Sequence, residues 1–106
     1  MLKNAVVFAA GLWALSFQAQ ASDVDLGKKV FTKEAQPGCS LCHALADAGA
    51  VGAIGPDLDE LKPSREQVVN AVTGGVGIMP AFNESLSADQ IGAVADYIVQ
   101  VTGGGS

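Results

Sequence analysis

Histidine, cysteine and aromatic residues are scarce in this chain of 106 residues, which has one histidine, two cysteines, one tryptophan and one tyrosine. Since His and Cys together supply only three ligands, a four-ligand zinc site would need a carboxylate as its fourth. Because the chain has one histidine, it cannot supply two imidazoles to one metal ion. The composition therefore argues against metal sites built from several histidines or cysteines.

Basic residues are also few, with six Lys and Arg against eleven Asp and Glu and a formal net charge of −5. Without the first 21 residues, five cations remain against eleven anions, a formal charge of −6. Such a surface repels nucleic acid and anionic lipid. We therefore expect neither nucleic acid nor a membrane surface as a partner.

The chain lacks an apolar run long enough to cross a membrane as a helix, which takes about 20 residues. Its apolar-rich stretch covers only residues 5–17, with Lys3 before it and Ala19, Gln20 and Ala21 after it. This order is typical of a secretory signal peptide. A retained anchor is the alternative, but the short run and the cleavage site disfavour it. We expect removal of residues 1–21 and export of residues 22–106 to the periplasm as one soluble domain.

Few large side chains remain to form a core after this removal, because Phe31, Phe82 and Tyr97 are then the aromatic residues. Chains this short rarely gather more than a few kcal/mol of stability from their own side chains. They usually contain a cross-link, a metal or a buried cofactor in addition. We therefore expect one here.

The motif Cys39-Ser40-Leu41-Cys42-His43 indicates which cofactor is bound, because C-x-x-C-H is the spacing that attaches haem covalently. Each thiol adds to one vinyl group of the porphyrin to form a thioether, and a short helical turn from Cys39 to Cys42 can span the two vinyls. His43 then lies beneath the iron. The motif predicts one covalently attached haem c.

A redox dithiol and a zinc site are the alternative interpretations of the same cysteines. A dithiol oxidoreductase usually places this motif at the strand-to-helix turn of a βαβ unit, and nothing in the sequence predicts a parallel sheet. The zinc site lacks a fourth His or Cys ligand. Both are therefore less favoured than haem attachment.

Apolar periodicity predicts three main helices, over residues 22–35, 65–73 and 88–102. Ser22 or Asp23 can begin the first helix, in which Gly27 indicates a close helix crossing. The other two helices follow capping boxes at residues 64–67 and 87–90. Residues 44–53 predict a loop around the haem edge, and residues 103–106 should fray. We expect an all-α fold.

Met79 is the only methionine left once Met1 is removed, and it lies in a glycine-rich loop before Pro80. A lone methionine more often fills a gap in a core. Beside a C-x-x-C-H motif, however, its thioether becomes a candidate ligand for the iron face opposite His43. From the residues alone, the sixth position is occupied by Met79, is open, or has an unusual ligand such as an amine or water.

The order of these signals resembles that of the class I c-type cytochromes: a helix with a glycine and an aromatic residue, C-x-x-C-H, a Gly-Pro loop, a helix, a Met-Pro loop and a closing helix. The resemblance implies that fold, with haem-wrapping loops. It also implies that Gly27 and Phe31 of the first helix meet Tyr97 of the last. It implies thioethers at Cys39 and Cys42 and axial iron ligation by His43 and Met79. It also implies that the Pro56 carbonyl accepts a hydrogen bond from His43.

One feature departs from the family. Many class I cytochromes have a tryptophan near an inner haem propionate, whereas Trp13, the only one here, falls in the predicted signal peptide. Lys62 and Arg65 are the candidates for holding the propionates.

The functional expectation is a periplasmic monohaem one-electron carrier without enzyme activity, because a six-coordinate iron has no vacant position for substrate. The patch around Pro37, Gly38 and residues 77–81 would be the contact for redox partners, namely a periplasmic dehydrogenase or a terminal oxidase or reductase. The protein would be a monomer or join transient complexes. The alternative is a cytochrome subunit of a periplasmic oxidoreductase complex, for example one oxidising sulfite or an alcohol. An enzyme or gas sensor with an open iron site is the least favoured.

Overall fold

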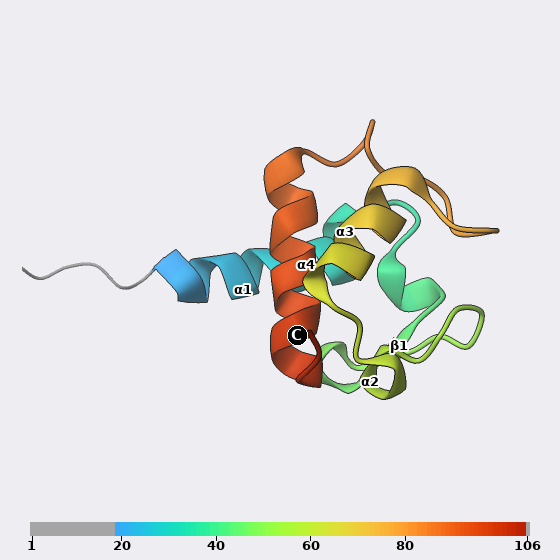
Figure 1. Cartoon of the computed structure of the whole chain (residues 1–106), viewed down its shortest axis with the longest axis horizontal. Coiled ribbons are helices and arrows are strands. Elements are labelled where there is room, and N and C mark those ends of the chain that lie inside the picture. Colours follow the sequence, from blue (N-terminus) through green and yellow to red (C-terminus); the bar gives the residue numbers. More distant parts are fainter. Residues whose placement is uncertain (1–18, 106) are drawn as a thin grey trace, which may run out of the picture.

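The computed structural model describes residues 19–105, and three helices are the longest elements of this part of the chain. The predicted signal peptide, residues 1–21, lies outside the described residues except for its last three positions. The main helices are α1 (Ala19–Lys29), α3 (Arg65–Gly74) and α4 (Ala88–Thr102). Figure 1 shows α1 at the left, α4 in the centre with α3 beside it, and the longer loops at the right. The predicted all-α fold of three main helices is confirmed.

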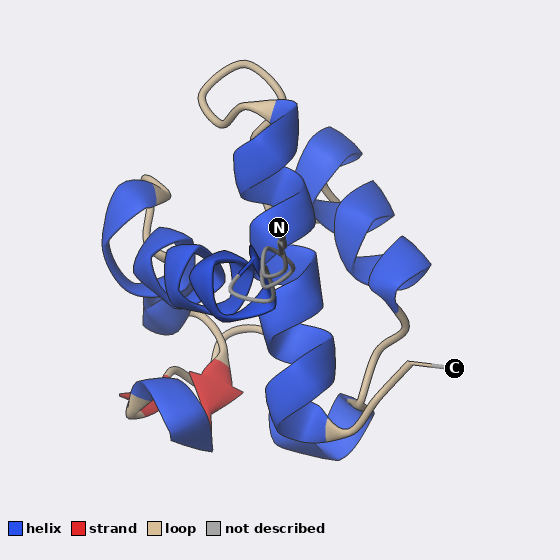
Figure 2. Cartoon of the chain, turned by 90° about the vertical axis from the view of Figure 1, so that its left-hand side faces the viewer, coloured by secondary structure: helices blue, strands red, loops and turns tan. Residues whose placement is uncertain are grey.

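The centre of the fold is the crossing of α1 over α4 (Figures 1 and 2). A Cβ atom on Gly27 would overlap the Ala93 carbonyl oxygen and Tyr97 Cβ, so only glycine allows this approach. Next to it, the rings of Phe31 and Tyr97 meet edge to face, with centroids 6.2 Å apart and an interplanar angle of 63°. The predicted contact of the first and last helices is confirmed.

Gly27→Ala should therefore destabilise the protein. The added methyl group has no space between the two helices, and overpacking of this kind costs about 1–3 kcal/mol. Chemical denaturation of the haem-loaded protein measures the change. Gly74→Ala is the matched control, because a Cβ at Gly74, the last residue of α3, meets no atom within 4 Å. Equal stability of the two variants would contradict the close crossing.

The first helix differs from its predicted bounds. The described part of α1 already includes Ser22 and Asp23, so neither residue begins it. At its other end the helix continues as a π-helical segment, Val30–Glu34, before Ala35 turns extended with ψ of 139°. The predicted end at residue 35 is correct to one residue, and Val30 and Phe31 of the π segment are buried in the core.

The other two long helices begin where the sequence predicts, each with a complete capping box. Ser64 Oγ accepts a hydrogen bond from the Gln67 amide, and the Gln67 side chain accepts one from the Ser64 amide. Ser87 and Gln90 repeat the arrangement at α4. These boxes satisfy backbone donors that the first helical turn leaves free.

The loop between the haem motif and α3 contains more structure than the sequence predicts. Residues 44–53 form a hairpin, in which β1 (Ala44–Leu45) pairs antiparallel with β2 (Ala50–Val51) around a 3₁₀ turn (Ala46–Ala48). A short helix, α2 (Leu58–Leu61), follows, with Asp57 as its N-cap. Elements of two to four residues leave almost no periodic signal, which is why the prediction of a plain loop was wrong.

The end of the chain also differs from the prediction, because residues 103–105 are not frayed. Gly103 ends α4 in the left-handed region with φ of 72°. Gly104 donates its amide to Thr102 Oγ1 and lies so close to Lys62 and Pro63 that a Cβ would be 2.6 Å from their backbone atoms. The glycines thus fix the end of α4 against the segment that precedes α3.

Candidate haem-binding site

The C-x-x-C-H motif forms the short turn that its spacing predicts. Cys39–Leu41 is a 3₁₀ turn, and both the Cys42 amide at 3.2 Å and the His43 amide at 3.0 Å donate to the Cys39 carbonyl oxygen. Both cysteines are partly exposed free thiols. Burial raises the pKa of the Cys39 thiol to about 11, so it is protonated at neutral pH before any modification. The turn brings the two thiols and the imidazole together.

The imidazole of His43 has a defined tautomer. Its Nδ1 lies 2.7 Å from the carbonyl oxygen of Pro56. Because a carbonyl oxygen can only accept, Nδ1 is the donor and Nε2 keeps a free lone pair. A metal-binding histidine usually has its other ring nitrogen anchored in this way. The hydrogen bond that the resemblance implied is present.

Two glycines fit closely around this segment. A Cβ on Gly52 would lie 2.7 Å from the carbonyl carbon of Cys42, and one on Gly55 would lie 2.6 Å from His43 Cε1. The Gly55 amide also donates to the Cys42 carbonyl oxygen at 2.7 Å. The backbone of residues 52–55 thus forms a cradle for the imidazole. The role of these glycines was not predicted from the sequence, although the position of Gly55 just before Pro56 is a usable signal.

Gly55→Ala should displace the His43 ring. The methyl group would occupy the place of the imidazole edge, so the ring would have to rotate away from Pro56 or the loop would have to move. We expect a mixed-spin absorption spectrum of the oxidised haem-loaded protein and a lower unfolding temperature. Gly38→Ala is the control at the other end of the motif, because the nearest atom to its Cβ would be 3.7 Å away. An unchanged spectrum in both variants would rule out the cradle.

Met79 lies in a tightly folded loop after α3. Val76 and Met79 exchange two backbone hydrogen bonds, of 3.1 and 2.8 Å, with Gly77 between them at a positive φ of 58°. The Phe82 amide donates to the Val72 carbonyl oxygen at 2.8 Å, which closes the loop against α3. Met79 itself is partly buried against the core. The backbone of the predicted sulfur ligand is therefore fixed.

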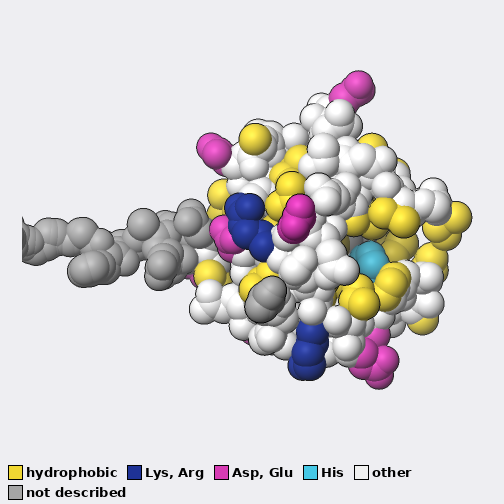
Figure 3. Space-filling model, viewed as in Figure 1, with side chains coloured by type: hydrophobic (Ala, Val, Ile, Leu, Met, Phe, Trp, Pro, Cys, Tyr) yellow, Lys and Arg dark blue, Asp and Glu magenta, His cyan; other side chains and the backbone are white. Residues whose placement is uncertain are grey.

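The His43 imidazole lies at the floor of a surface hollow (Figure 3). Apolar side chains surround it on this face, and no lysine or arginine borders it. Large apolar side chains are exposed around the domain: Leu41 (64%), Val51 (87%), Ile54 (66%), Leu61 (51%), Val76 (63%) and Ile78 (84%). All but Leu61 come from the segment of residues 39–56 or from the loop that contains Met79. Exposed apolar groups gathered this way mark a surface that something covers.

These features fit a porphyrin. The hollow is apolar, its floor presents a free imidazole nitrogen, and two thiols stand on the same turn as that imidazole. A flat, largely apolar ring attached at the thiols would cover side chains that otherwise face water. Among the described residues, no group of three or more His, Cys, Asp and Glu side chains could hold a bare metal ion.

The two candidates for the propionates bind other groups. Lys62 Nζ donates to the Thr102 carbonyl oxygen at 3.1 Å, at the end of α4. Arg65 Nε lies 2.6 Å from Asp96 Oδ1, also on α4. Both cations thus contact α4, and the expectation from the sequence that they hold the propionates has no support in the structure.

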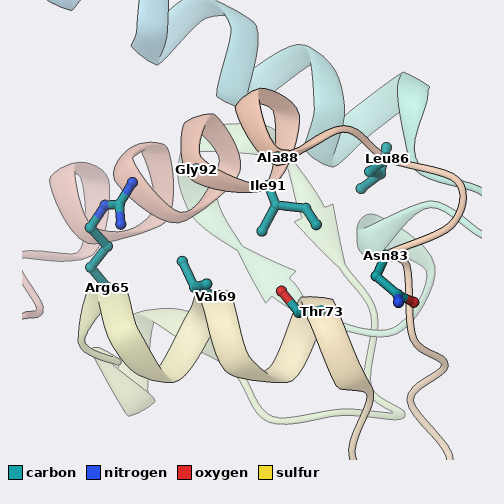
Figure 4. A pocket seen from close by; sticks show the side chains of 8 residues that line it. All are labelled: Arg65, Val69, Thr73, Asn83, Leu86, Ala88, Ile91 and Gly92. Carbon is teal, nitrogen blue, oxygen red and sulfur yellow. The ribbon is translucent and has the colours of Figure 1, made fainter.

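A second hollow of about 300 Å³ lies between α3 and α4 (Figure 4). Val69 and Thr73 point into it from α3, and Ile91 points into it from α4. Its lining contains no thiol, imidazole or carboxylate, and Arg65 at one end is already paired with Asp96. The groups of the haem motif do not contribute to this second hollow.

No helix in the described part of the chain is long and apolar enough to cross a membrane.

Comparison with known proteins agrees with this site. Residues 22–98 match the family described as "Cytochrome C oxidase, cbb3-type, subunit III". Cytochrome c6 of Leptolyngbya boryana is 38% identical over 82 residues, which are 74% of this chain and 92% of that protein. Cytochrome c6 of Gloeothece citriformis is 34% identical over 106 residues, covering 93% of this chain and 92% of that protein.

A solved structure is similar over most of the chain. The crystal structure of the c-type cytochrome SorU from Sinorhizobium meliloti superposes with a TM-score of 0.75 at 50% sequence identity, covering 81% of this chain and 98% of that chain. Sequence family, fold and the geometry of the C-x-x-C-H turn lead to the same assignment. The chain belongs to the small class I c-type cytochromes and is an electron carrier with one covalently attached haem c.

Proposed function

We propose that this cytochrome works in the periplasm as a mobile one-electron carrier, with His43 and Met79 as its two axial iron ligands. Thioethers at Cys39 and Cys42 would attach the haem, and the mature chain would begin at Ser22. The observation that carries the proposal is the hydrogen bond of 2.7 Å between His43 Nδ1 and the Pro56 carbonyl oxygen, which leaves Nε2 free for iron. When bound, haem supplies an iron that gains or loses one electron.

The protein groups around the iron would keep its coordination constant in both oxidation states. Pro56 holds the proton of His43 on Nδ1, and Gly55 confines the ring. Backbone hydrogen bonds on both sides of Met79 fix the loop that would bring its sulfur to the other face. Ligands held in this way need little movement when the charge on the iron changes. Sulfur ligation and apolar surroundings favour the reduced iron, so the reduction potential should be positive.

The contact surface for redox partners would be the patch around Pro37, Gly38 and residues 77–81, together with the apolar rim of the hollow. Val51 and Ile78, exposed by 87% and 84%, lie on the hairpin and on the loop of Met79. Small apolar patches suit transient contacts of low area. Partners would therefore present an apolar surface to this rim, as expected of a periplasmic dehydrogenase or a terminal oxidase or reductase.

Potentiometric titration of the exported protein tests this function. We expect one reversible transition with the slope of a single electron and a positive midpoint, and no rapid binding of carbon monoxide to the reduced form. Rapid carbon monoxide binding at neutral pH would instead indicate an open iron site, as in an enzyme or gas sensor.

Copurification distinguishes the free carrier from a subunit of a stable oxidoreductase complex. A free carrier elutes alone at its monomer size.

A further inference from the structure

A carboxylate outside the set of haem-binding residues joins three elements of the fold. Asp47 lies in the 3₁₀ turn of the hairpin. Its Oδ2 accepts a hydrogen bond of 2.6 Å from the Tyr97 hydroxyl of α4. Lys28 of α1 places its Nζ 3.5 Å from the same oxygen. The turn is thus attached to both helices of the central crossing.

The Tyr97 hydroxyl has a role beyond packing. The whole residue is 0% exposed, and its ring packs against Phe31, which a phenylalanine could do equally well. A buried phenol costs stability unless its hydroxyl finds a partner. Here the partner is Asp47, whose side chain is 44% exposed at the surface end of this contact. The hydroxyl therefore ties the surface turn to the buried core.

The turn that Asp47 anchors is close to His43 along the chain. Asp47 follows His43 by four residues, and four residues of even fully extended chain span at most about 14 Å. On its other side, the amide of the neighbouring Ala46 donates to Asp59 Oδ2 of α2 at 2.7 Å. Helix α2 directly follows Pro56 and Asp57, and Pro56 accepts the hydrogen bond from His43. The segment after His43 is thus held from two directions, by α2 and by α4.

The charges in this cluster support the same arrangement. The hydrogen bond from Tyr97 is the main cause that lowers the pKa of Asp47, so the carboxylate is charged at neutral pH. Burial, followed by the contact with Asp47, raises the pKa of Tyr97, so its hydroxyl stays a neutral donor. Lys28 and Asp59 are the other charged groups that act on this pair.

We propose that Asp47 is a positioning residue of the haem site. Held by Tyr97 and Lys28, it fixes the turn after His43 to the crossing of α1 and α4, and its negative charge lowers the reduction potential of the iron. The second part rests on the proposed electron-carrier function. A fixed anion near the iron stabilises the oxidised form, which has one more positive charge.

Hydrogen exchange of the haem-loaded protein tests the positioning role in Tyr97→Phe, which keeps the ring and removes only the donor. Two amides of the turn should exchange about tenfold faster or more in this variant. They are the Ala46 amide, which donates to Asp59, and the Gly49 amide, which donates to the Ala46 carbonyl oxygen. The amides of α3 should keep their protection. Equal acceleration in the turn and in α3, or no change in the turn, would overturn the proposal.

The reduction potential tests the charge in Asp47→Asn, which keeps the shape and an acceptor for Tyr97. The midpoint should move to a more positive value. Asp25→Asn is the matched control and should leave the midpoint in place, because Asp25 is an exposed residue of α1, and that helix extends to the side of the domain opposite the hollow (Figures 1 and 3). Equal midpoints in wild type and Asp47→Asn would overturn the electrostatic part. The outcome is separable from the ligand assignment, because a wild type without Met79 ligation would lack the sulfur-to-iron absorption band in every variant.

Discussion

The double variant Cys39→Ala/Cys42→Ala should be largely unfolded, with most of its helical far-ultraviolet signal lost. Without the thiols no haem is attached, and the described core then has Phe31, Phe82 and Tyr97 as its aromatic residues. A domain of this size depends on an additional stabilising group, and here that group is the covalently held porphyrin. Circular dichroism of the purified variant measures the effect.

Leu41→Ala is the control for this experiment. It changes an exposed residue between the two cysteines and leaves both thiols and His43 in place, so haem attachment and helical signal should be retained. A double cysteine variant with the circular dichroism spectrum and cooperative melting of the wild type would show that the polypeptide folds without its cofactor. The proposed dependence of the core on haem would then be wrong.

Met79→Ala should produce the second large effect. The oxidised variant would lose the weak absorption band at the red end of the spectrum that sulfur ligation gives, and its midpoint potential would fall. Axial ligand identity can move haem potentials over a range of about 0.8 V, so the fall should far exceed that of any surface change. The reduced variant should also bind carbon monoxide rapidly, because its sixth position is then open.

Ile78→Ala is the matched control in the same loop. Ile78 is 84% exposed and directly precedes Met79, so its removal changes the loop but not the sulfur. It should retain the band and nearly the same midpoint. If Met79→Ala behaves like Ile78→Ala, the sixth ligand is another group and the assignment of Met79 fails.

Features with strong local chemistry could be predicted from the sequence. The C-x-x-C-H motif predicts its own 3₁₀ turn because its atoms are contiguous in the chain. The capping boxes at Ser64 and Ser87 predict two helix starts because the residues that satisfy the free amides are three positions apart. Gly27 indicates the helix crossing because no other residue allows that approach.

Features that depend on distant residues could not be predicted. The contact of Tyr97 with Asp47 joins positions 50 residues apart, and neither residue type predicts the other. Lys62 and Arg65 are plausible propionate partners by charge alone, yet α4 supplies a carbonyl and a carboxylate closer to them. The left-handed backbone of Lys62, with φ of 48°, ends α2 where a glycine would be expected. Tertiary packing decides each of these cases.

The proton NMR spectrum of the reduced protein, labelled with ¹³C at methionine methyl groups, tests the iron coordination most directly. Residues 22–106 contain a single methionine, Met79, so the chain without its proposed signal peptide would give one methionine methyl signal. If its sulfur binds the iron, the methyl group lies over the porphyrin ring, and the ring current shifts the signal far upfield of all ordinary methyl groups. A single strongly shifted signal is the predicted result. A methyl signal at the ordinary position of methionine would contradict His43/Met79 ligation.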